Sequence, residues 1–240
     1  MSDFNEYVRS SFSEYGDIMK DNKSAYNSGI YDDKIINVLP YYKEYHGQII
    51  DLVRSMRFSD PDWLDTGCGT GTLARRALED RSDVKFTLCD PSENMLAEAK
   101  EKLAGEDIRF FNISSQQMMF ESEFDVVTAV QSLHYLKREE RKTAVSKCYQ
   151  ALRENGVFIT FENIRMSSDG SDAIALTRWA HFLDEHGNSA EDVQMHIDRR
   201  GTEVFPITIE EHISVLRECG FKSVDLLWSS YLQAGFWALK

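Results

Sequence analysis

The sequence predicts an α/β fold with a doubly wound, largely parallel sheet that binds a nucleoside-like ligand. A strand-like segment at residues 62–66 runs into a loop with Gly67, Gly69 and Gly71, and a helical apolar pattern follows. A second strand-like segment at 84–90 ends in an acid. Strands and helices then alternate as far as residue 161, which is typical of parallel strands joined by crossover helices.

The glycine loop indicates the kind of ligand. Glycines let the backbone turn sharply and let a ligand lie against it, where a Cβ would collide. A dinucleotide-binding loop reads G-x-G-x-x-G and receives a pyrophosphate, but here the third glycine comes one position early, at Gly71. Asp65, two residues before the first glycine, would repel a phosphate and attract a cation. We therefore expect a positively charged nucleoside without phosphate.

Asp90 is the second residue that points to a nucleoside ligand. It ends an alternating strand about 20 residues past the glycine loop, the spacing at which a carboxylate meets ribose hydroxyls. Pro91 then opens a predicted helix, with Met95 on its buried face. The alternative is a plain strand, turn and helix with a surface acid.

These residues resemble motif I of the class I S-adenosylmethionine-dependent methyltransferases, D/E-x-G-x-G-x-G. The resemblance implies S-adenosylmethionine as cofactor and S-adenosylhomocysteine as product. It places the glycine loop beside the methionine part of the cofactor, Asp90 on the ribose, and Val130 and Gln131 at the methionine end. Ser114 stands where the family usually has an acid for the adenine. The predicted cofactor-binding residues are Tyr42, Asp65, Gly67, Gly69, Gly71, Asp90, Pro91, Met95, Ser114, Ser115, Val130 and Gln131.

Methyl transfer from a sulfonium needs mainly alignment, and a general base only where the acceptor must lose a proton. His134 follows the fourth predicted strand at the pocket mouth and is the candidate base, although a hydrogen-bonded loop histidine is the common alternative. The remaining histidines are weaker candidates: His46, His181 and His196 in the cap or lid, and His186 and His212 at predicted surface helix positions.

The sequence divides into four segments. Residues 1–57 form a predicted helical cap that holds seven of the ten tyrosines, which either close over the cofactor or only pack. Residues 58–163 form the Rossmann-like core and 164–205 a helical lid. Residues 206–240 supply a closing helix and a hairpin, which the family resemblance makes the end of a seven-stranded sheet with an antiparallel last strand.

Composition limits the partners. Forty acidic and 27 basic side chains give a net charge of −13, which disfavours a dedicated nucleic-acid binder. The four cysteines have no C-x-x-C spacing, so we expect reduced thiols and no metal. We find no signal peptide and no apolar run of transmembrane length, and we expect a cytoplasmic protein. The oligomeric state is open.

A narrower resemblance links the chain to tRNA wobble-uridine carboxymethyltransferases, which use a carboxylated S-adenosylmethionine. The segments that carry it are residues 31–42, 89–92 and 235–240. It matches Tyr42 to a cofactor-contacting tyrosine and places Arg199 near an arginine that pairs with the extra carboxylate. Arg199 and Arg200 could equally be solvated helix-end residues. The glycine loop departs from that group, so we interpret the similarity as shared cap architecture.

The sequence therefore predicts a methyltransferase that acts on a small-molecule acceptor. The alternatives are a tRNA wobble-uridine (carboxy)methyltransferase and a non-catalytic S-adenosylmethionine-binding protein.

Overall fold

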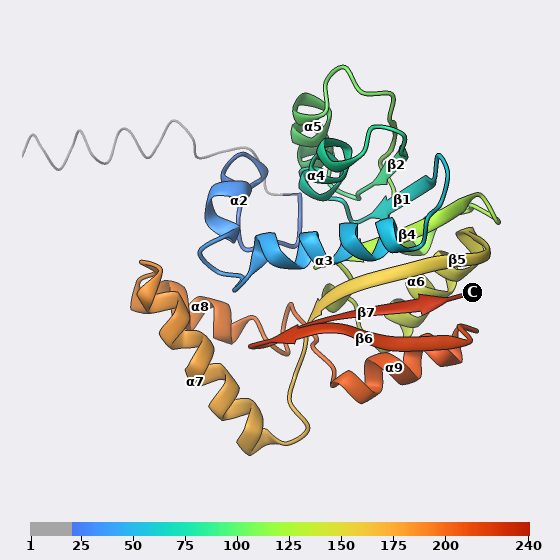
Figure 1. Cartoon of the computed structure of the whole chain (residues 1–240). Coiled ribbons are helices and arrows are strands. Elements are labelled where there is room, and N and C mark those ends of the chain that lie inside the picture. Colours follow the sequence, from blue (N-terminus) through green and yellow to red (C-terminus); the bar gives the residue numbers. More distant parts are fainter. Residues whose placement is uncertain (1–20) are drawn as a thin grey trace, which may run out of the picture.

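A seven-stranded sheet forms the centre of the protein (Figure 1). The computed structural model describes residues 21–240, and the part of the predicted cap at 1–20 lies outside them. The strand order is β3-β2-β1-β4-β5-β7-β6. The strands are β1 Asp62–Thr66, β2 Lys85–Cys89, β3 Arg109–Phe111, β4 Phe124–Val130, β5 Leu152–Asn163, β6 Ser223–Ser230 and β7 Gln233–Leu239.

Neighbouring strands from β3 to β5 are parallel, and β7 is antiparallel to both β5 and β6. This confirms the predicted α/β fold and its antiparallel last strand. The strand order reverses between β1 and β4, and a crevice opens at that switch point, beyond the carboxyl ends of the strands.

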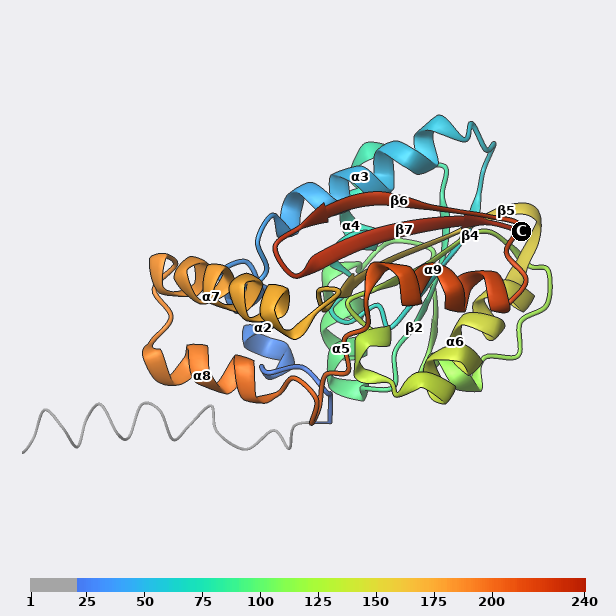
Figure 2. The same cartoon turned by 90° about the horizontal axis from the view of Figure 1, so that it is seen from below.

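Helices cover both faces of the sheet, as Figures 1 and 2 show. The described helices are α2 Ser28–Ile35, α3 Tyr42–Ser55, α4 Thr72–Asp80, α5 Glu93–Lys102, α6 Arg138–Ala151, α7 Asp169–Glu185, α8 Ala190–Asp198 and α9 Ile209–Glu218, with short 3-10 turns η1 Ser115–Gln117 and η2 Leu133–Tyr135. α3 and α4 bury apolar residues on one face, and α6 and α9 on the other. The parallel strands are thus buried on both sides, which is why their sequences are almost continuously apolar.

The helices α2, α7 and α8 lie together at the end of the sheet where the crevice opens (Figure 2). A small separate core joins them, in which Trp179 of α7 donates its indole N–H to the Val38 carbonyl at 3.0 Å. Helix α8 begins with a capping box between Ser189 and Asp192, as its sequence predicts. The segment 164–205 therefore packs against the segment before α3, over the crevice.

Three local expectations differ from the structure. The sequence before Pro40 predicts a helix over 32–38, but the helix spans Ser28–Ile35, and turns lead from it to Pro40. The residues Glu154, Asn155 and Gly156 predict a turn, but they lie inside β5, as an irregularity in its pairing with β4. His212 was expected at the surface but is buried, because the inner face of α9 stacks it on Phe236 of β7.

Candidate functional site

The glycine loop joins β1 to α4, and its three glycines have different surroundings. All three have positive φ, between 55° and 74°. A Cβ on Gly67 would lie 2.4 Å from the Cβ of Ser132, and one on Gly71 would lie 2.9 Å from Leu103 of α5. A Cβ on Gly69 would meet nothing within 4 Å, because Gly69 faces a cavity. Gly69 thus leaves room for a ligand, whereas Gly71 lets two helices approach closely.

Asp90 connects the glycine loop to the start of α5. One carboxylate oxygen accepts a hydrogen bond from Gly69 N at 2.9 Å, and the other accepts one from Ser92 N at 2.9 Å. Burial raises the pKa of Asp90, while these two backbone hydrogen bonds lower it. Asp90 also lines the cavity, so its remaining lone pairs can accept hydrogen bonds from a ligand.

Asp65, at the end of β1, is the second carboxylate on the cavity. It is 2% exposed and accepts a hydrogen bond from Thr128 Oγ1 at 2.7 Å. Thr128 in turn accepts one from the indole N–H of Trp63 at 2.9 Å. Burial raises the pKa of Asp65 to about 7, so a cationic ligand group would favour its ionised form.

The cavity has a volume of about 240 Å³. It is lined by eleven of the twelve predicted cofactor-binding residues, all except Gly71. Several other lining residues carry no specific signal in the sequence, namely Asn22, Lys23, Ser24, Thr70, Thr72, Gln116 and Leu136. The segment 22–24 reaches the cavity because Asp21 accepts hydrogen bonds from Ser92 Oγ and Asn94 N at the start of α5.

Tyrosines form one wall of this cavity. Tyr31, Tyr42, Tyr45 and Tyr135 come from α2, α3 and η2, and burial raises the pKa of each phenol, so all four are neutral. Tyr45 Oη is buried and has no hydrogen-bond partner among the described residues. The same holds for Nδ1 of His46, which also lines the cavity. Burial and the charge of Arg76 lower the pKa of His46 to about 3.

A second cavity of about 60 Å³ adjoins the first. The two share the lining residues Ser24, Tyr31, Gln131 and Tyr135, so these four form the boundary between them. Residues of α7, α8 and the segment after α8 form the far side, including Trp179, His196, Arg199 and Arg200.

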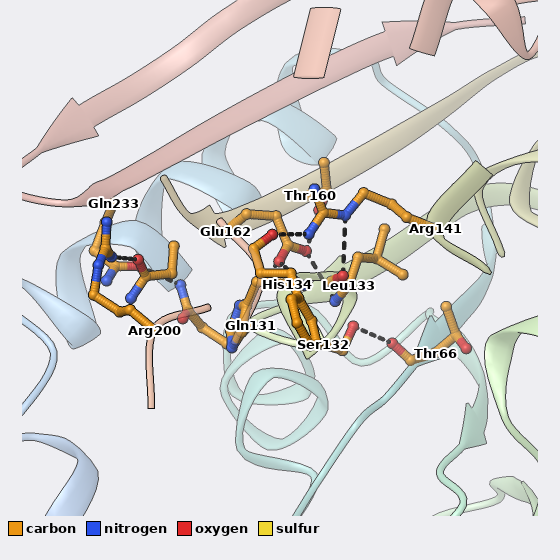
Figure 3. A network of polar contacts seen from close by, with 12 residues as sticks. Thr66, Gln131, Ser132, Leu133, His134, Arg141, Thr160, Glu162, Arg200 and Gln233 are labelled. Atoms are coloured by element: carbon orange, nitrogen blue, oxygen red, sulfur yellow. Dashed lines mark hydrogen bonds and ion pairs between the residues drawn. The ribbon is translucent and has the colours of Figure 1, made fainter. Parts of the chain in front are cut away.

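His134 lines the second cavity and not the first. The sequence predicts His134 at the pocket mouth, but the side chain of His134 is only 5% exposed. Nδ1 lies 3.0 Å from a carboxylate oxygen of Glu162, at the end of β5 (Figure 3). Glu162 could not be found from the sequence, since nothing in an apolar strand shows which loop residue its terminal acid will contact.

Arg199 and Arg200 are not solvated helix-end residues, since their side chains are 11% and 10% exposed. Arg200 donates to Asn163 Oδ1 at 2.6 Å and pairs with Asp172 of α7 at 3.2 Å. Arg199 pairs with Glu203 at 2.8 Å and donates to the Lys23 carbonyl. Because Glu203 is exposed to solvent, Arg199 is the less completely neutralised cation of the two.

No group of three or more His, Cys, Asp or Glu side chains within residues 21–240 is arranged to hold a metal ion. No helix of that region is long and apolar enough to cross a membrane.

Comparisons with known proteins agree with this fold. Residues 64–158 match the family model described as a methyltransferase domain. A carboxy-S-adenosyl-L-methionine synthase of Nautilia profundicola is 22% identical over 207 residues, 85% of this chain and 88% of that protein. The same enzyme of Shewanella amazonensis is 28% identical over 222 residues, 89% of this chain and 90% of that protein.

Among solved structures, the S-adenosylmethionine-dependent methyltransferase SibL in its apo form superposes with a TM-score of 0.60. It is 16% identical, and the match covers 83% of this chain and 55% of SibL. This likeness shows the fold. Together with the family match, it confirms the predicted recognition and its cofactor class, S-adenosylmethionine. Residues 64–158 of this chain therefore match a methyltransferase domain, and the chain has the fold of the class I S-adenosylmethionine-dependent methyltransferases.

Proposed function

We propose that the protein is an S-adenosylmethionine-dependent methyltransferase for a small anionic acceptor, with the cofactor in the first cavity and the acceptor in the second. The observation that carries this proposal is the pair of adjoining cavities with four shared wall residues. An in-line displacement needs donor and acceptor held on either side of one methyl group, and two connected compartments provide that arrangement.

The first cavity suits the cofactor because of its charges. Asp65 and Asp90 face it, and Lys23 is the one lysine or arginine among its described lining residues. Such a lining favours a ligand with an ammonium and a sulfonium over a phosphate ligand. Asp90 would accept the ribose hydroxyls, and Ser114 and Ser115 would lie near the adenine. The tyrosine wall would face the sulfonium, since a cation over a neutral aromatic ring is stabilised.

The second cavity suits an acceptor with a negative charge. Arg199 and Arg200 line it, and the counterion of Arg199 is exposed to water. A guanidinium in a site of this burial pairs more strongly with a carboxylate than it would in bulk water. The volume of the second cavity, about 60 Å³, limits the acceptor to a small group. His134 is the proposed general base.

A binding experiment tests the cofactor assignment, and a turnover assay tests the acceptor. Calorimetry with the full chain should show binding of S-adenosylmethionine and S-adenosylhomocysteine. Turnover is then measured by mass spectrometry on a panel of hydroxylated and enolisable carboxylic acids, with the methyl esters of the same acids as controls. We expect a methylated product from an acid and little from its ester. Equal turnover of acid and ester would contradict the anionic acceptor.

An Arg199→Gln variant should raise the KM for the acid by a larger factor than the Kd of the cofactor, because Arg199 lines the second cavity and reaches the first through its hydrogen bond to the Lys23 carbonyl. Arg217→Gln, an exposed arginine at the end of α9, removes the same charge and should change neither.

A second candidate is synthesis of a carboxylated cofactor. It is favoured by the similarity to carboxy-S-adenosyl-L-methionine synthases and by Arg199 in the second cavity, where it could pair with an added carboxylate. The same mass spectra separate the two reactions. Methyl transfer gives S-adenosylhomocysteine and a methylated acceptor, whereas the second reaction leaves a carboxylated S-adenosylmethionine.

The two remaining alternatives predict different outcomes. A tRNA-modifying enzyme would bind tRNA in a salt-dependent manner, which the charge of −13 disfavours. A non-catalytic binding protein would bind the cofactor and turn over no acid of the panel.

A further inference from the structure

We propose that Glu162 is the positioning residue of the reaction: it holds His134 with Nδ1–H toward its carboxylate, so that Nε2 takes the proton from an acceptor in the second cavity. This inference rests on the proposed function and assigns the acceptor to compounds whose nucleophilic atom carries a proton, a hydroxyl or an acidic carbon.

Glu162 is fully buried and fixes η2 through several hydrogen bonds. One carboxylate oxygen accepts from the backbone N–H of His134 at 2.8 Å and lies 3.0 Å from its Nδ1 (Figure 3). The other accepts from Thr160 Oγ1 at 2.7 Å and from Leu133 N at 3.3 Å. The carboxylate therefore holds both the backbone and the ring of His134.

The backbone of this turn is also held by other elements. The His134 carbonyl accepts a hydrogen bond from Phe205 N at 2.7 Å. Arg141 of α6, which is 2% exposed, donates to the carbonyls of Leu133 and Phe205 at 3.1 and 2.6 Å. Residues of β5, α6 and the segment before α9 thus converge on the η2 turn and hold the backbone of His134 in place.

The charge state of Glu162 selects the tautomer of His134. Although burial raises the pKa of Glu162, the His134 hydrogen bond and the charges of His134, His212 and Arg141 lower it, and the net direction is down. An ionised carboxylate only accepts hydrogen bonds, so Nδ1 must carry the proton. In the neutral ring Nε2 is then the acceptor, on the opposite side of the imidazole, and His134 lines the second cavity.

The reaction balances with these groups. A lone pair on the acceptor atom attacks the methyl carbon, the carbon–sulfur bond breaks, and its electron pair stays on sulfur as S-adenosylhomocysteine. The acceptor proton passes to Nε2, and the Glu162 carboxylate stabilises the imidazolium that results. The proton returns to solvent after product release. An acceptor that is nucleophilic without losing a proton would need neither residue.

Other titratable groups also face His134 and belong in the test. They are Arg141 from α6, His212 from α9, and His196, Arg199 and Arg200 around the second cavity. All five of these groups are basic. Glu162 is therefore the neighbour whose negative charge favours the protonated ring of His134.

The first readout is the ¹⁵N NMR spectrum of the His134 ring in the full chain, assigned by its loss in His134→Gln. We expect the Nδ1–H tautomer in the neutral ring, with and without S-adenosylmethionine. The Nε2–H tautomer would overturn the proposal. This measurement on the unaltered protein decides the tautomer even if variants of Glu162 do not fold.

The second readout uses Glu162→Gln, which keeps the shape and removes the charge. We expect the Nδ1–H tautomer to be less populated in this variant, because an amide can donate to Nδ1 as well as accept from it. Glu218→Gln, which removes an exposed carboxylate on α9, is the matched control and should leave the tautomer unchanged. The same tautomer population in both variants would overturn the proposal.

Turnover of an acceptor acid by Glu162→Gln should show a lower kcat, with KM little changed. A lower kcat with an unaltered ring tautomer would mean a structural role only. Failure of the proposed function is distinguishable, since it appears as absent cofactor binding in calorimetry, whereas the ring tautomer is read without any turnover.

Discussion

Asp90 Oδ2 and the backbone nitrogen of Gly69 lie 2.9 Å apart, and this hydrogen bond joins the end of β2 to the loop that follows β1. The two strands are parallel neighbours, so their carboxyl ends meet at the same edge of the sheet. Two motifs separated by 21 residues are thereby held in one geometry on one cavity. The carboxylate proposed to bind the ribose also orders the loop proposed to hold the methionine.

Asp90→Ala should weaken binding of S-adenosylmethionine by about 1–3 kcal/mol, the cost of leaving polar partners unsatisfied. Calorimetry checks the affinity. Thr208→Ala is the control: it removes the α9 cap, in which Thr208 Oγ1 accepts from Glu211 N at 3.2 Å, and Thr208 lines neither cavity. It should lower the stability by ~1 kcal/mol and leave the affinity nearly unchanged. An unaltered affinity in Asp90→Ala would refute the ribose assignment.

Cofactor binding should release protons near neutral pH, and the source is Asp65. Its pKa is about 7 in the free protein, so it is close to half protonated at that pH. A bound ammonium lowers that pKa, the carboxylate ionises, and the affinity rises as the pH increases through the free-protein value. Calorimetry in buffers of different ionisation enthalpy should find about half a proton released at pH 7. In Asp65→Asn this release should disappear. Release of the same size in that variant would assign it to another group.

Gly71→Ala should destabilise the fold more than it disturbs binding. Its backbone has φ of 74°, and an added Cβ would lie 2.9 Å from Leu103 and 3.2 Å from Ala99. Gly105→Ala is the control for backbone strain alone, because Gly105 has φ of 94° and open space around it. We expect a loss of ~1 kcal/mol for Gly105→Ala and a further ~1–3 kcal/mol for Gly71→Ala, measured by urea unfolding. Equal losses would mean that α5 yields to the extra methyl group.

The buried, unpartnered hydroxyl of Tyr45 should cost stability in the free protein. Tyr45→Phe removes it and should stabilise the unliganded chain by up to ~1–3 kcal/mol, measured by urea unfolding. If the ligand supplies the missing partner, the same variant binds S-adenosylmethionine more weakly. Tyr42→Phe is the contrast, since the Tyr42 hydroxyl hydrogen-bonds to Thr72 and its loss should destabilise the free chain. A destabilised Tyr45→Phe would mean that this hydroxyl has a partner in solution.

The loop and the two acids could be found in the sequence because strand, turn and helix patterns are local. Gly67, Gly69 and Asp90 follow strands directly, and parallel strands bring such residues to one edge by topology alone. The position of Gly71 could not be predicted from the motif alone. It belongs to the same motif but packs against α5 instead of lining the cavity.

The burial of histidines and arginines could not be predicted in this way. His212 occupies a helix position that looks exposed in isolation, and it is buried because β7 lies against that face of α9. Arg199 and Arg200 end a helix, where solvent exposure is common, yet α7 and the segment at 22–24 cover them.

The sequence by itself determined the α/β class, the glycine loop, both cavity acids and the cap of α8, because each depends on residues close together in the chain. Only the tertiary structure decided that His134 meets Glu162, which lies 28 residues away, and that a second cavity adjoins the first. Such pairings depend on how β5, α6 and the segment 164–205 pack, and contacts between distant segments leave no periodic signal in a single sequence.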